Sequence, residues 1–317
     1  KCISCGACIY QCPFGAIVDK SFVVDVLNLL KNSWNNTSYH VYAVVAPAVS
    51  SQFQGVKTEQ VYAGIKELGF YDVVEAAIGA DMVSAFEAKE LAETVEEKGW
   101  KTSSCCPAFV DYVEKNYPQF VDHISTAVSP MIATARAIKA KDKKARVVFV
   151  GPCTAKKVEM KRESLKDAVD IVITFEELQA IFDAREIELT SLEPRMAGEA
   201  SSFGRNFART GGVTESVAHT LELSGLDLDV KAVRCNGIDE CIKAMKMASF
   251  GKLDANFIEG MACKHGCTGG AASLLHDAKG IEMINRYGKE SKTDNPLEIL
   301  EKYPIDNINM ERFNHED

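Results

Sequence analysis

The chain alternates short apolar runs rich in β-branched residues with longer segments whose apolar residues recur at helical spacing. Six runs predict strands, at 41–47, 72–78, 146–151, 170–174, 229–234 and 254–260. Four segments predict helices, at 57–69, 81–99, 174–184 and 236–248. Near-continuous apolar strands separated by helices are typical of a parallel sheet covered on both faces. The pattern therefore predicts an α/β fold whose second half continues the first.

Cysteines follow the ends of several predicted strands. Cys153 comes just past the strand at 146–151, and Cys263 comes just past the strand at 254–260. Cys105 and Cys106 follow the short run "GWKTS". Open α/β sheets bind their ligands in the loops beyond the carboxyl ends of parallel strands. We therefore expect these cysteines to converge on one site.

Composition excludes some classes of function. The 317 residues can bury a sizeable core, in one large domain or in two smaller ones. The formal net charge of -9, without a run rich in Lys and Arg, argues against nucleic acid or an anionic membrane as the main partner. No apolar stretch approaches the ~18 residues of a membrane span. Most of the eleven cysteines are clustered, which indicates metal ligation in a reducing compartment and hence a cytoplasmic protein.

The first cysteine group is "CISCGACIYQCP", in which Cys2, Cys5, Cys8 and Cys12 precede Pro13. This spacing is that of bacterial ferredoxins, where three cysteines bind one [4Fe–4S] cube and the fourth reaches a second cube. Zinc sites usually present cysteines in separated pairs, and a disulfide knot needs an oxidising compartment, so both alternatives are disfavoured. Because this run is one ligand short for its cube, we expect a second such run upstream.

Three further motifs follow: "TSSCCPAF" at 102–109, "GPCTAKKVE" at 151–159 and "EGMACKHGCTGG" at 259–270. Together they contain four cysteines, enough for a second cube: Cys106, Cys153, Cys263 and Cys267. Cys105 is then left over. A disulfide between Cys105 and Cys106 would be strained, because adjacent Cα atoms lie about 3.8 Å apart, closer than a relaxed disulfide allows.

These three motifs, in this order and behind a ferredoxin-type run, resemble the signature of the iron-only ([FeFe]) hydrogenases. The resemblance covers essentially the whole chain. It implies an α/β H-cluster domain at 26–317, with two lobes of parallel sheet flanked by helices, preceded at 1–25 by the C-terminal half of a two-cluster ferredoxin-like module. It also implies the H-cluster as cofactor, in which a [4Fe–4S] cube is joined through one cysteine to a di-iron subsite with CO, cyanide and a bridging azadithiolate.

The resemblance also implies roles for individual residues. The cube ligands would be Cys106, Cys153, Cys263 and Cys267, with Cys267 bridging to the di-iron subsite. Lys156 would donate to a cyanide ligand, and Glu159 would pair with Lys156. The pocket around the subsite would be lined by Ala46, Pro47, Ser129 and Met261.

A proton route is implied as well. Cys105 would exchange protons with the bridging amine, and Glu87, Ser125 and Glu90 would form the relay beyond it. An unperturbed glutamate has a pKa near ~4.3 and a thiol near ~8.5, so protonating the glutamate from the thiol costs roughly 6 kcal/mol. Burial must therefore raise the pKa of at least one carboxyl group. A solvated acidic helix face is the simpler alternative, and it is more credible for Glu90 than for Glu87.

Several positions depart from the pattern of the well-studied members. Thr94 stands where some carry an arginine at the outer end of the relay, and Gly151 stands where they have a pocket-lining Met. Met131 replaces a Gln, and the third motif continues as "CTGGAAS" rather than as a longer glycine string ending in Gln-Pro. The chain therefore resembles a less typical subgroup.

Three functions fit these motifs. The first is an enzyme that interconverts H2 with protons and electrons, served by a redox partner such as ferredoxin and by maturation proteins that build the di-iron subsite. The second is an H2 sensor with the same cofactor, which Gly151 keeps open. The third is an iron–sulfur cluster assembly relative without the subsite. Cys105, Lys156 and the two glutamates favour the enzyme, because an assembly factor needs neither a proton relay nor a cyanide donor. Cys235 and Cys241 are predicted to be buried structural thiols.

Overall fold

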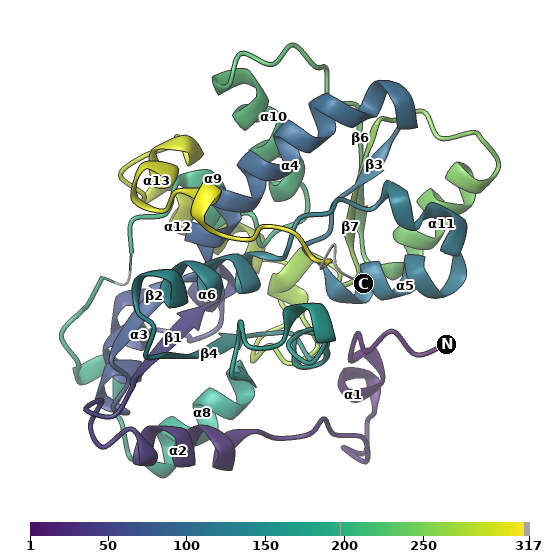
Figure 1. Cartoon of the computed structure of the whole chain (residues 1–317). Coiled ribbons are helices and arrows are strands. Elements are labelled where there is room, and N and C mark those ends of the chain that lie inside the picture. Colours follow the sequence, from purple (N-terminus) through teal and green to yellow (C-terminus); the bar gives the residue numbers. More distant parts are fainter. Residues whose placement is uncertain (197, 314–317) are drawn as a thin grey trace.

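Two parallel sheets form the framework of the molecule (Figure 1). The computed structural model describes residues 1–196 and 198–313. The first sheet has the order β2-β1-β4-β5 and the second has the order β3-β7-β6, and all neighbouring strands are parallel. The strands are β1 (His40–Val45), β2 (Asp72–Glu75), β3 (Lys101–Thr102), β4 (Ala145–Gly151), β5 (Ile171–Thr174), β6 (Ala232–Asn236) and β7 (Phe257–Met261). The expected α/β fold with two lobes of parallel sheet is confirmed.

The strands of the first sheet are apolar on both faces. Val41, Ala43, Val44 and Val45 of β1 are fully buried, and Val44 pairs with Val74 of β2 on one side and with Phe149 of β4 on the other. Burial on both faces explains why these strands have continuous apolar runs instead of an alternating pattern.

Helices cover the two sheets and connect them. The longest, α4 (Ala76–Lys98), starts directly after β2 of the first sheet and ends just before β3 of the second (Figure 1). It packs against α6, α10 and α13. The other α-helices are α1 (Ala7–Gln11), α2 (Val23–Asn32), α3 (Thr58–Glu67), α5 (Pro107–Asn116), α6 (Pro130–Lys141), α7 (Ala155–Glu159), α8 (Phe175–Ala184), α9 (Ser202–Asn206), α10 (Gly212–Leu223), α11 (Ile238–Ser249), α12 (Gly280–Lys289) and α13 (Pro296–Lys302). Short 3-10 segments are η1 (Pro47–Ser51), η2 (Pro118–His123), η3 (Glu163–Leu165), η4 (Leu189–Ser191), η5 (Gly266–Gly269) and η6 (Ile305–Asn307).

A buried ion pair fastens α9 and α12 to the end of β2. Glu75, the last residue of β2, accepts a hydrogen bond from Arg205 Nη2 of α9 at 2.9 Å and another from the Tyr287 hydroxyl of α12. Tyr62 of α3 completes the network at 2.8 Å from the Tyr287 hydroxyl. A buried ion pair is tolerated only when its remaining polar atoms have partners, as they have here.

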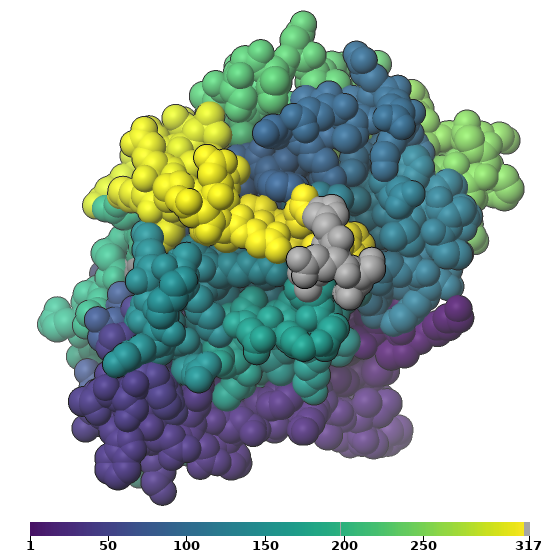
Figure 2. Space-filling model, in the orientation of Figure 1, coloured from purple at the N-terminus to yellow at the C-terminus, as the bar shows by residue number. Residues whose placement is uncertain are grey.

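The C-terminal segment runs along the surface beside residues 126–128. Val128 N donates to Met310 O at 2.7 Å, and Arg312 N donates to Thr126 O at 2.8 Å. Figure 2 shows this segment (yellow) passing between the region of α4 (blue) and the teal region that contains α6. It therefore covers the stretch of chain that follows Ser125.

All six predicted strands are present, with shifts at their ends. The strand expected at 72–78 is wrong beyond Glu75, because Ala76 begins α4, and helix α4 accordingly starts earlier than the predicted residue 81. Residues 76–78, "AAI", are good or moderate helix formers, so they join the first turn of α4 instead of extending the strand. The strand expected at 229–234 starts only at Ala232. The two-residue strand β3 was not predicted, since two residues have no measurable period.

The division into 1–25 and 26–317 stays a prediction, and residues 314–317 lie outside the described part of the chain. Across the residues that the structure does describe, none of the helices has the length and apolar character needed to cross a membrane.

Candidate functional site

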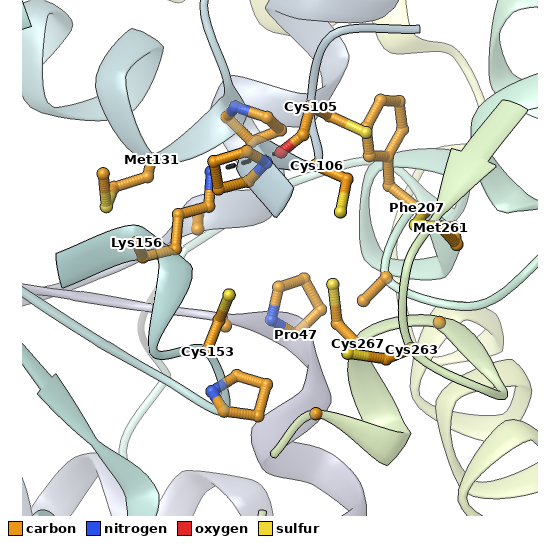
Figure 3. Close-up of a pocket in the computed structure, with 18 of the residues that line it drawn as sticks. Pro47, Cys105, Cys106, Met131, Cys153, Lys156, Phe207, Met261, Cys263 and Cys267 are labelled. Atoms are coloured by element: carbon orange, nitrogen blue, oxygen red, sulfur yellow. Dashed lines mark hydrogen bonds between the residues drawn. The ribbon is translucent and has the colours of Figure 1, made fainter. Parts of the chain in front are cut away.

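One cavity lies at the carboxyl ends of strands from both sheets, as the strand pattern predicted (Figure 3). The loops that follow β1, β3, β4 and β7 surround it. Its surface is almost entirely apolar apart from sulfur atoms and one ammonium group. The lining residues include Ala46, Pro47, Cys105, Cys106, Met131, Phe149, Cys153, Lys156, Phe207, Met261, Cys263 and Cys267. Apolar crevices with a few converging polar groups are typical of ligand sites.

Four thiols meet in this cavity from three separate loops. Cys106 precedes α5, Cys153 lies between β4 and α7, and Cys263 and Cys267 lie after β7. In Figure 3 the sulfur atoms of Cys106, Cys153 and Cys267 point toward a common hollow, and Cys263 lies beside Cys267. The expectation that Cys105, Cys106, Cys153 and Cys263 converge on one site is confirmed, since all four line the cavity.

The thiols need a strongly electropositive partner to become ligands. Burial raises the pKa of Cys153 to about 11 and that of Cys267 to about 12, and it raises the pKa of Cys263 well above its usual value. Metal ligation requires thiolates, so metal binding must drive off these protons. Among the residues described here, no group of three or more His, Cys, Asp or Glu side chains could hold a single metal ion. Four converging thiols are the ligand number that a [4Fe–4S] cube requires.

The loop that carries Cys263 and Cys267 depends on close backbone packing. Gly266 has a φ of +71°, and a Cβ added there would lie 2.6 Å from Ala208 O. A Cβ on Gly270 would lie 2.4 Å from Pro152 O, in the loop of Cys153. Only glycine fits both positions. The backbone N–H of His265 donates to Asn236 Oδ1, which ties the loop to the end of β6.

Lys156 is the ammonium group in the cavity lining. It is 8% exposed, and its Nζ donates to Glu159 Oε2 at 2.7 Å and to the carbonyl oxygen of Cys105 at 3.2 Å. Burial lowers the pKa of Lys156, but Glu159 and the nearby thiols outweigh this, so the net pKa is raised. Within the described part of the chain, two of the three N–H donors are thus used. The third can meet an anionic ligand in the cavity, which is the chemistry that a cyanide donor requires.

Cys105 and Cys106 point in different directions (Figure 3). Cys106 faces the other three thiols, whereas the Cys105 side chain turns away from them. Cys105 is buried, and burial raises the pKa of its thiol well above the usual value, with Glu87 and the neighbouring thiols adding to the rise and Lys156 opposing it. The doublet therefore separates a potential ligand from a thiol that keeps its proton.

Glu87 lies behind Cys105 and is 1% exposed. Its Oε1 accepts from Ser104 N at 3.1 Å and from Ser104 Oγ at 3.2 Å, while Oε2 has no hydrogen-bond partner among the described residues. Burial raises the pKa of Glu87 to about 7, the Ser104 bonds lower it and the Glu90 charge raises it. A proton relay requires the pKa of Glu87 to rise toward that of the Cys105 thiol. The pKa of Cys105 is itself raised, so the rise at Glu87 closes only part of the gap. The solvated-face alternative is wrong for Glu87.

Glu90 follows one helical turn later on α4 and is held by three donors. Ser125 Oγ donates to Oε2 at 2.6 Å, Thr126 N donates to Oε1 at 3.0 Å, and Lys101 Nζ donates to Oε1 at 2.6 Å. Its side chain is 12% exposed. Ser125 also acts on Glu87, so this hydroxyl lies near both carboxyl groups. A solvated acidic face is therefore the wrong description of Glu90 as well.

The expected pocket residues separate into two places. Ala46, Pro47 and Met261 line the main cavity, together with Met131. Ser129 does not; it lines a small adjoining cavity with Ser104, Glu159 and Arg312, and its buried hydroxyl has no partner among the described residues.

Phe149 compensates for the missing side chain at Gly151. A Cβ on Gly151 would lie 2.6 Å from the Phe149 ring and 3.2 Å from the Ala46 Cβ. Residues two apart on a strand share a face, so the ring of Phe149 covers Gly151 and lines the cavity in its place.

The N-terminal cysteine run lies against the same loops. Thr154 Oγ1 donates to Ser4 O at 3.0 Å, and Gly6, with a φ of +76°, approaches Thr154 and Ala271 so closely that a Cβ would clash with both. Cys5 packs in a cluster with Cys106 and Cys153. A cube held by this run would therefore be adjacent to one held in the main cavity. Cys235 and Cys241 are fully buried in a hydrophobic cluster against which Cys106 also packs, and burial of this kind is expected of structural thiols.

Comparison with known proteins decides the family. Residues 39–271 match the family described as "Iron only hydrogenase large subunit, C-terminal domain". The chain belongs to the iron-only hydrogenase large-subunit family. Residues 1–18 match the "4Fe-4S binding domain". Both matches support the expected cofactors, [4Fe–4S] clusters and the H-cluster, which the residues present fit.

Relatives of this hydrogenase-family chain include two kinds of protein. It is 31% identical to Iron hydrogenase 1 of Clostridium pasteurianum over 86% of this chain and 56% of that protein. It is 28% identical to the NADP-reducing hydrogenase subunit HndD of Solidesulfovibrio fructosivorans, over 90% of this chain and 58% of that one. It is also 25% identical to the cytosolic Fe-S cluster assembly factor NAR1 of Debaryomyces hansenii, over 62% of this chain and 40% of that one. The chain thus spans a little over half the length of the two hydrogenase relatives.

Solved structures of the family share the fold. A [FeFe]-hydrogenase structure from work on oxygen inactivation of the H cluster has a TM-score of 0.74 at 22% identity, covering 94% of this chain and 97% of that one. A variant of HydA1 from Chlamydomonas reinhardtii has a TM-score of 0.72 at 22% identity, covering 90% and 95%. At this identity the likeness concerns the fold alone.

Sequence reasoning missed three residues at this site. Ser104 donates to Glu87 and stands next to Cys105, so its place in the motif was an available signal. Phe149 was recognisable from its strand spacing to Gly151. Lys101 gave no local signal, because its contact with Glu90 joins β3 to α4.

Proposed function

We propose that this chain is the H-cluster domain of a [FeFe] hydrogenase that catalyses H2 ⇌ 2 H⁺ + 2 e⁻. The observation that carries the proposal is the meeting of four thiols, one buried ammonium and one separate thiol in a single apolar cavity. Electrons would pass through the adjacent N-terminal [4Fe–4S] site to a redox partner such as ferredoxin. Maturation proteins would supply the di-iron subsite, and a cytoplasmic location stays a prediction.

The residues present fit the H-cluster. Cys106, Cys153, Cys263 and Cys267 would hold it, with Cys267 bridging to the di-iron subsite. When bound, the cofactor would supply an iron that takes up hydride and an amine that takes up a proton, which together split H2 heterolytically. Lys156, oriented by Glu159, would donate to an anionic ligand in the cavity.

Protons would leave the cavity through Cys105. Burial raises the pKa of its thiol, so Cys105 is protonated at neutral pH and can give its proton into the cavity and be recharged from outside. Glu87, with a pKa of about 7, would be the next carrier, and Ser125 and Glu90 would follow. The apolar lining made by Phe149, Phe207 and Met261 would exclude water from the reacting groups.

The second candidate function is iron–sulfur cluster assembly, which the similarity to NAR1 favours. An assembly factor could use the same four thiols without a di-iron subsite. It would have no use for a buried carboxyl group of raised pKa behind an unligated thiol. Cys105 with Glu87 therefore supports the enzyme over the assembly factor.

Infrared spectroscopy tests the proposal. The full chain is produced together with [FeFe]-hydrogenase maturation proteins, and its spectrum is recorded alongside an assay of H2 evolution. We expect CO and cyanide stretching bands and H2 turnover. A protein that contains iron–sulfur clusters but shows neither bands nor turnover contradicts the proposal and leaves the assembly function.

Replacing the thiol at position 105 tests the proton route. Cys105→Ala should retain the infrared bands and lose at least about 100-fold in turnover, since the first proton carrier is absent. Cys235→Ala is the matched control, because Cys235 is a buried thiol that is not among the described residues lining the cavity. Unimpaired turnover in Cys105→Ala would refute the role of this residue.

A further inference from the structure

We propose that Lys101 is a positioning residue of the proton route. From strand β3 its ammonium group holds the carboxylate of Glu90, the outermost glutamate of the relay. Some members of the family place an arginine near this point, where this chain has Thr94. The inference rests on the proposed function, and it assigns a role to a residue that no motif marks.

Lys101 and Glu90 form a buried ion pair. Lys101 is 3% exposed, and its Nζ lies 2.6 Å from Glu90 Oε1. Lysine is almost never buried to this degree unless its charge is paired. Across residues 1–196 and 198–313, the carboxylate of Glu90 is the one acid paired with this ammonium.

Lys101 reaches Glu90 from strand β3 of the second sheet. Its backbone is fixed in the edge strand β3, where Lys101 pairs with Phe257 and its N–H donates to Asn256 O at 3.0 Å. Strand β3 in turn packs against α4, the helix that carries both glutamates. The position of the ammonium is thus set by the sheet and not by the flexibility of a surface loop.

Thr94 cannot supply the missing cation. It is half-buried one turn after Glu90, and its hydroxyl donates to the Glu90 carbonyl oxygen at 2.7 Å instead of to the carboxylate. Residues four apart on a helix are neighbours, so a longer cation at position 94 would lie on the same face as the Glu90 side chain. The cation that contacts the Glu90 carboxylate therefore comes from strand β3, through Lys101, and not from position 94 of helix α4.

The ammonium acts through Glu90 and does not carry protons itself. A lysine ammonium has three donors and no acceptor, so it can stabilise and orient a carboxylate without accepting a proton from it. Lys101 Nζ holds Oε1, Thr126 N donates to Oε1 at 3.0 Å and to Oε2 at 3.2 Å, and Oε2 also accepts from the Ser125 hydroxyl at 2.6 Å. Ser125 is the group that lies near both glutamates. Lys101 thus fixes the geometry in which Glu90 takes over a proton.

The test compares four variants of the matured full chain: K101M, K101R, K101M with T94R, and the control K98M. Lys98 lies at the end of the same helix and donates to a backbone carbonyl, that of Asp122. We expect K101M to lower H2 turnover about tenfold, less than the roughly 100-fold loss expected when a proton carrier itself is removed. K101R should retain most turnover because it keeps the cation, T94R should restore most of what K101M loses, and K98M should match the wild type.

Two further readouts separate positioning from mere structural support. The solvent deuterium isotope effect on turnover should rise in K101M and return toward the wild-type value with T94R, because proton transfer becomes rate-limiting only when Glu90 is misplaced. In the cluster-free protein, K101M and E90Q should each lower the melting temperature by several degrees, and the double variant K101M/E90Q should recover most of that loss, as expected of a buried pair.

The outcomes distinguish this inference from the function on which it rests. A wild-type protein without turnover and without infrared bands overturns both. Where the wild type is active, unchanged turnover in K101M overturns the role of Lys101 alone. Reduced turnover with an unchanged isotope effect and no rescue by T94R also overturns it, since the ion pair would then only support the fold.

Discussion

Glu87 and Glu90 are of one residue type, lie one turn apart on α4, and yet have opposite environments. Glu87 is fully buried, has one oxygen without a partner among the described residues and meets no cation through its carboxylate. Glu90 accepts from an ammonium, a hydroxyl and a backbone N–H. The elements that face the helix cause the difference: Glu87 meets the loop of Ser104, and Glu90 meets β3 and the Ser125 loop. Two carboxyl groups with different surroundings can hold a proton at one step and release it at the next.

The largest expected effect on turnover is that of Glu87→Gln, which removes the buried carboxyl group. A glutamine is close in shape but cannot carry a proton, so turnover of the matured protein should fall by at least about 100-fold. The measurement is H2 evolution with a chemical electron donor, with cluster content checked by infrared spectroscopy. Glu93→Gln is the control, because Glu93 is exposed on the same helix. A Glu87→Gln variant of wild-type rate would contradict the relay.

A second test uses the pH dependence of stability in the cluster-free protein. The pKa of Glu87 is about 7 in the folded chain and about 4.5 when exposed. Between these values the unfolded chain loses the proton and the folded chain keeps it, so stability falls as the pH rises from about 4.5 to 7. The difference amounts to about 3 kcal/mol above pH 7. Denaturant unfolding from pH 4 to pH 8 should show this loss in the wild type.

The matched comparison for this test is Glu87→Gln. Asp81, another buried carboxyl group with a pKa of about 7, contributes in the same pH range, so the wild type alone does not isolate Glu87. The stability of Glu87→Gln relative to the wild type should be near zero at pH 4 and should rise to about 3 kcal/mol in favour of the variant at pH 8. A difference that does not change with pH would show that Glu87 titrates normally.

The same contrast explains what the sequence could predict. Cluster ligands lie in short motifs directly after strand ends, so spacing and the strand pattern were sufficient to predict that Cys106, Cys153 and Cys263 converge. The two glutamates were recognised as a pair by their spacing on one helix. Their environments were not predictable, because helical periodicity says nothing about which element faces the helix.

Lys101 marks the limit of such reasoning. Its strand has two residues, too few for a period, and its partner lies on another element. Ser129 shows the converse: its motif position suggested the main cavity, but as the residue before α6 its side chain lies in the adjoining small cavity. Local motifs fix which residues are near the site, and tertiary packing fixes which cavity each one enters.

A smaller effect is expected from Ser104→Ala. The single O–H of Ser104 is shared between Ala127 O at 2.7 Å and Glu87 Oε1 at 3.2 Å, and its loss should cost about 1 kcal/mol of unfolding free energy. Because this hydroxyl lowers the pKa of Glu87, its removal should raise that pKa above about 7 and move the stability transition to higher pH. In the Glu87→Gln background the shift should vanish. A shift that persists there would come from another group.

The smallest effect is expected from Thr94→Val, which tests whether Thr94 helps to hold Glu90. Valine keeps the β-branched shape and removes only the hydroxyl, whose hydrogen bond goes to the Glu90 carbonyl oxygen and not to its carboxylate. Such a bond back to the preceding turn adds little, so unfolding free energy should change by no more than about 0.5 kcal/mol. Turnover should stay at the wild-type rate, because Lys101, Ser125 and Thr126 still hold the carboxylate. If Thr94→Val instead slowed turnover as much as K101M, the hydroxyl would belong to the proton exit, and Glu90 would be controlled from its own helix as well as from β3.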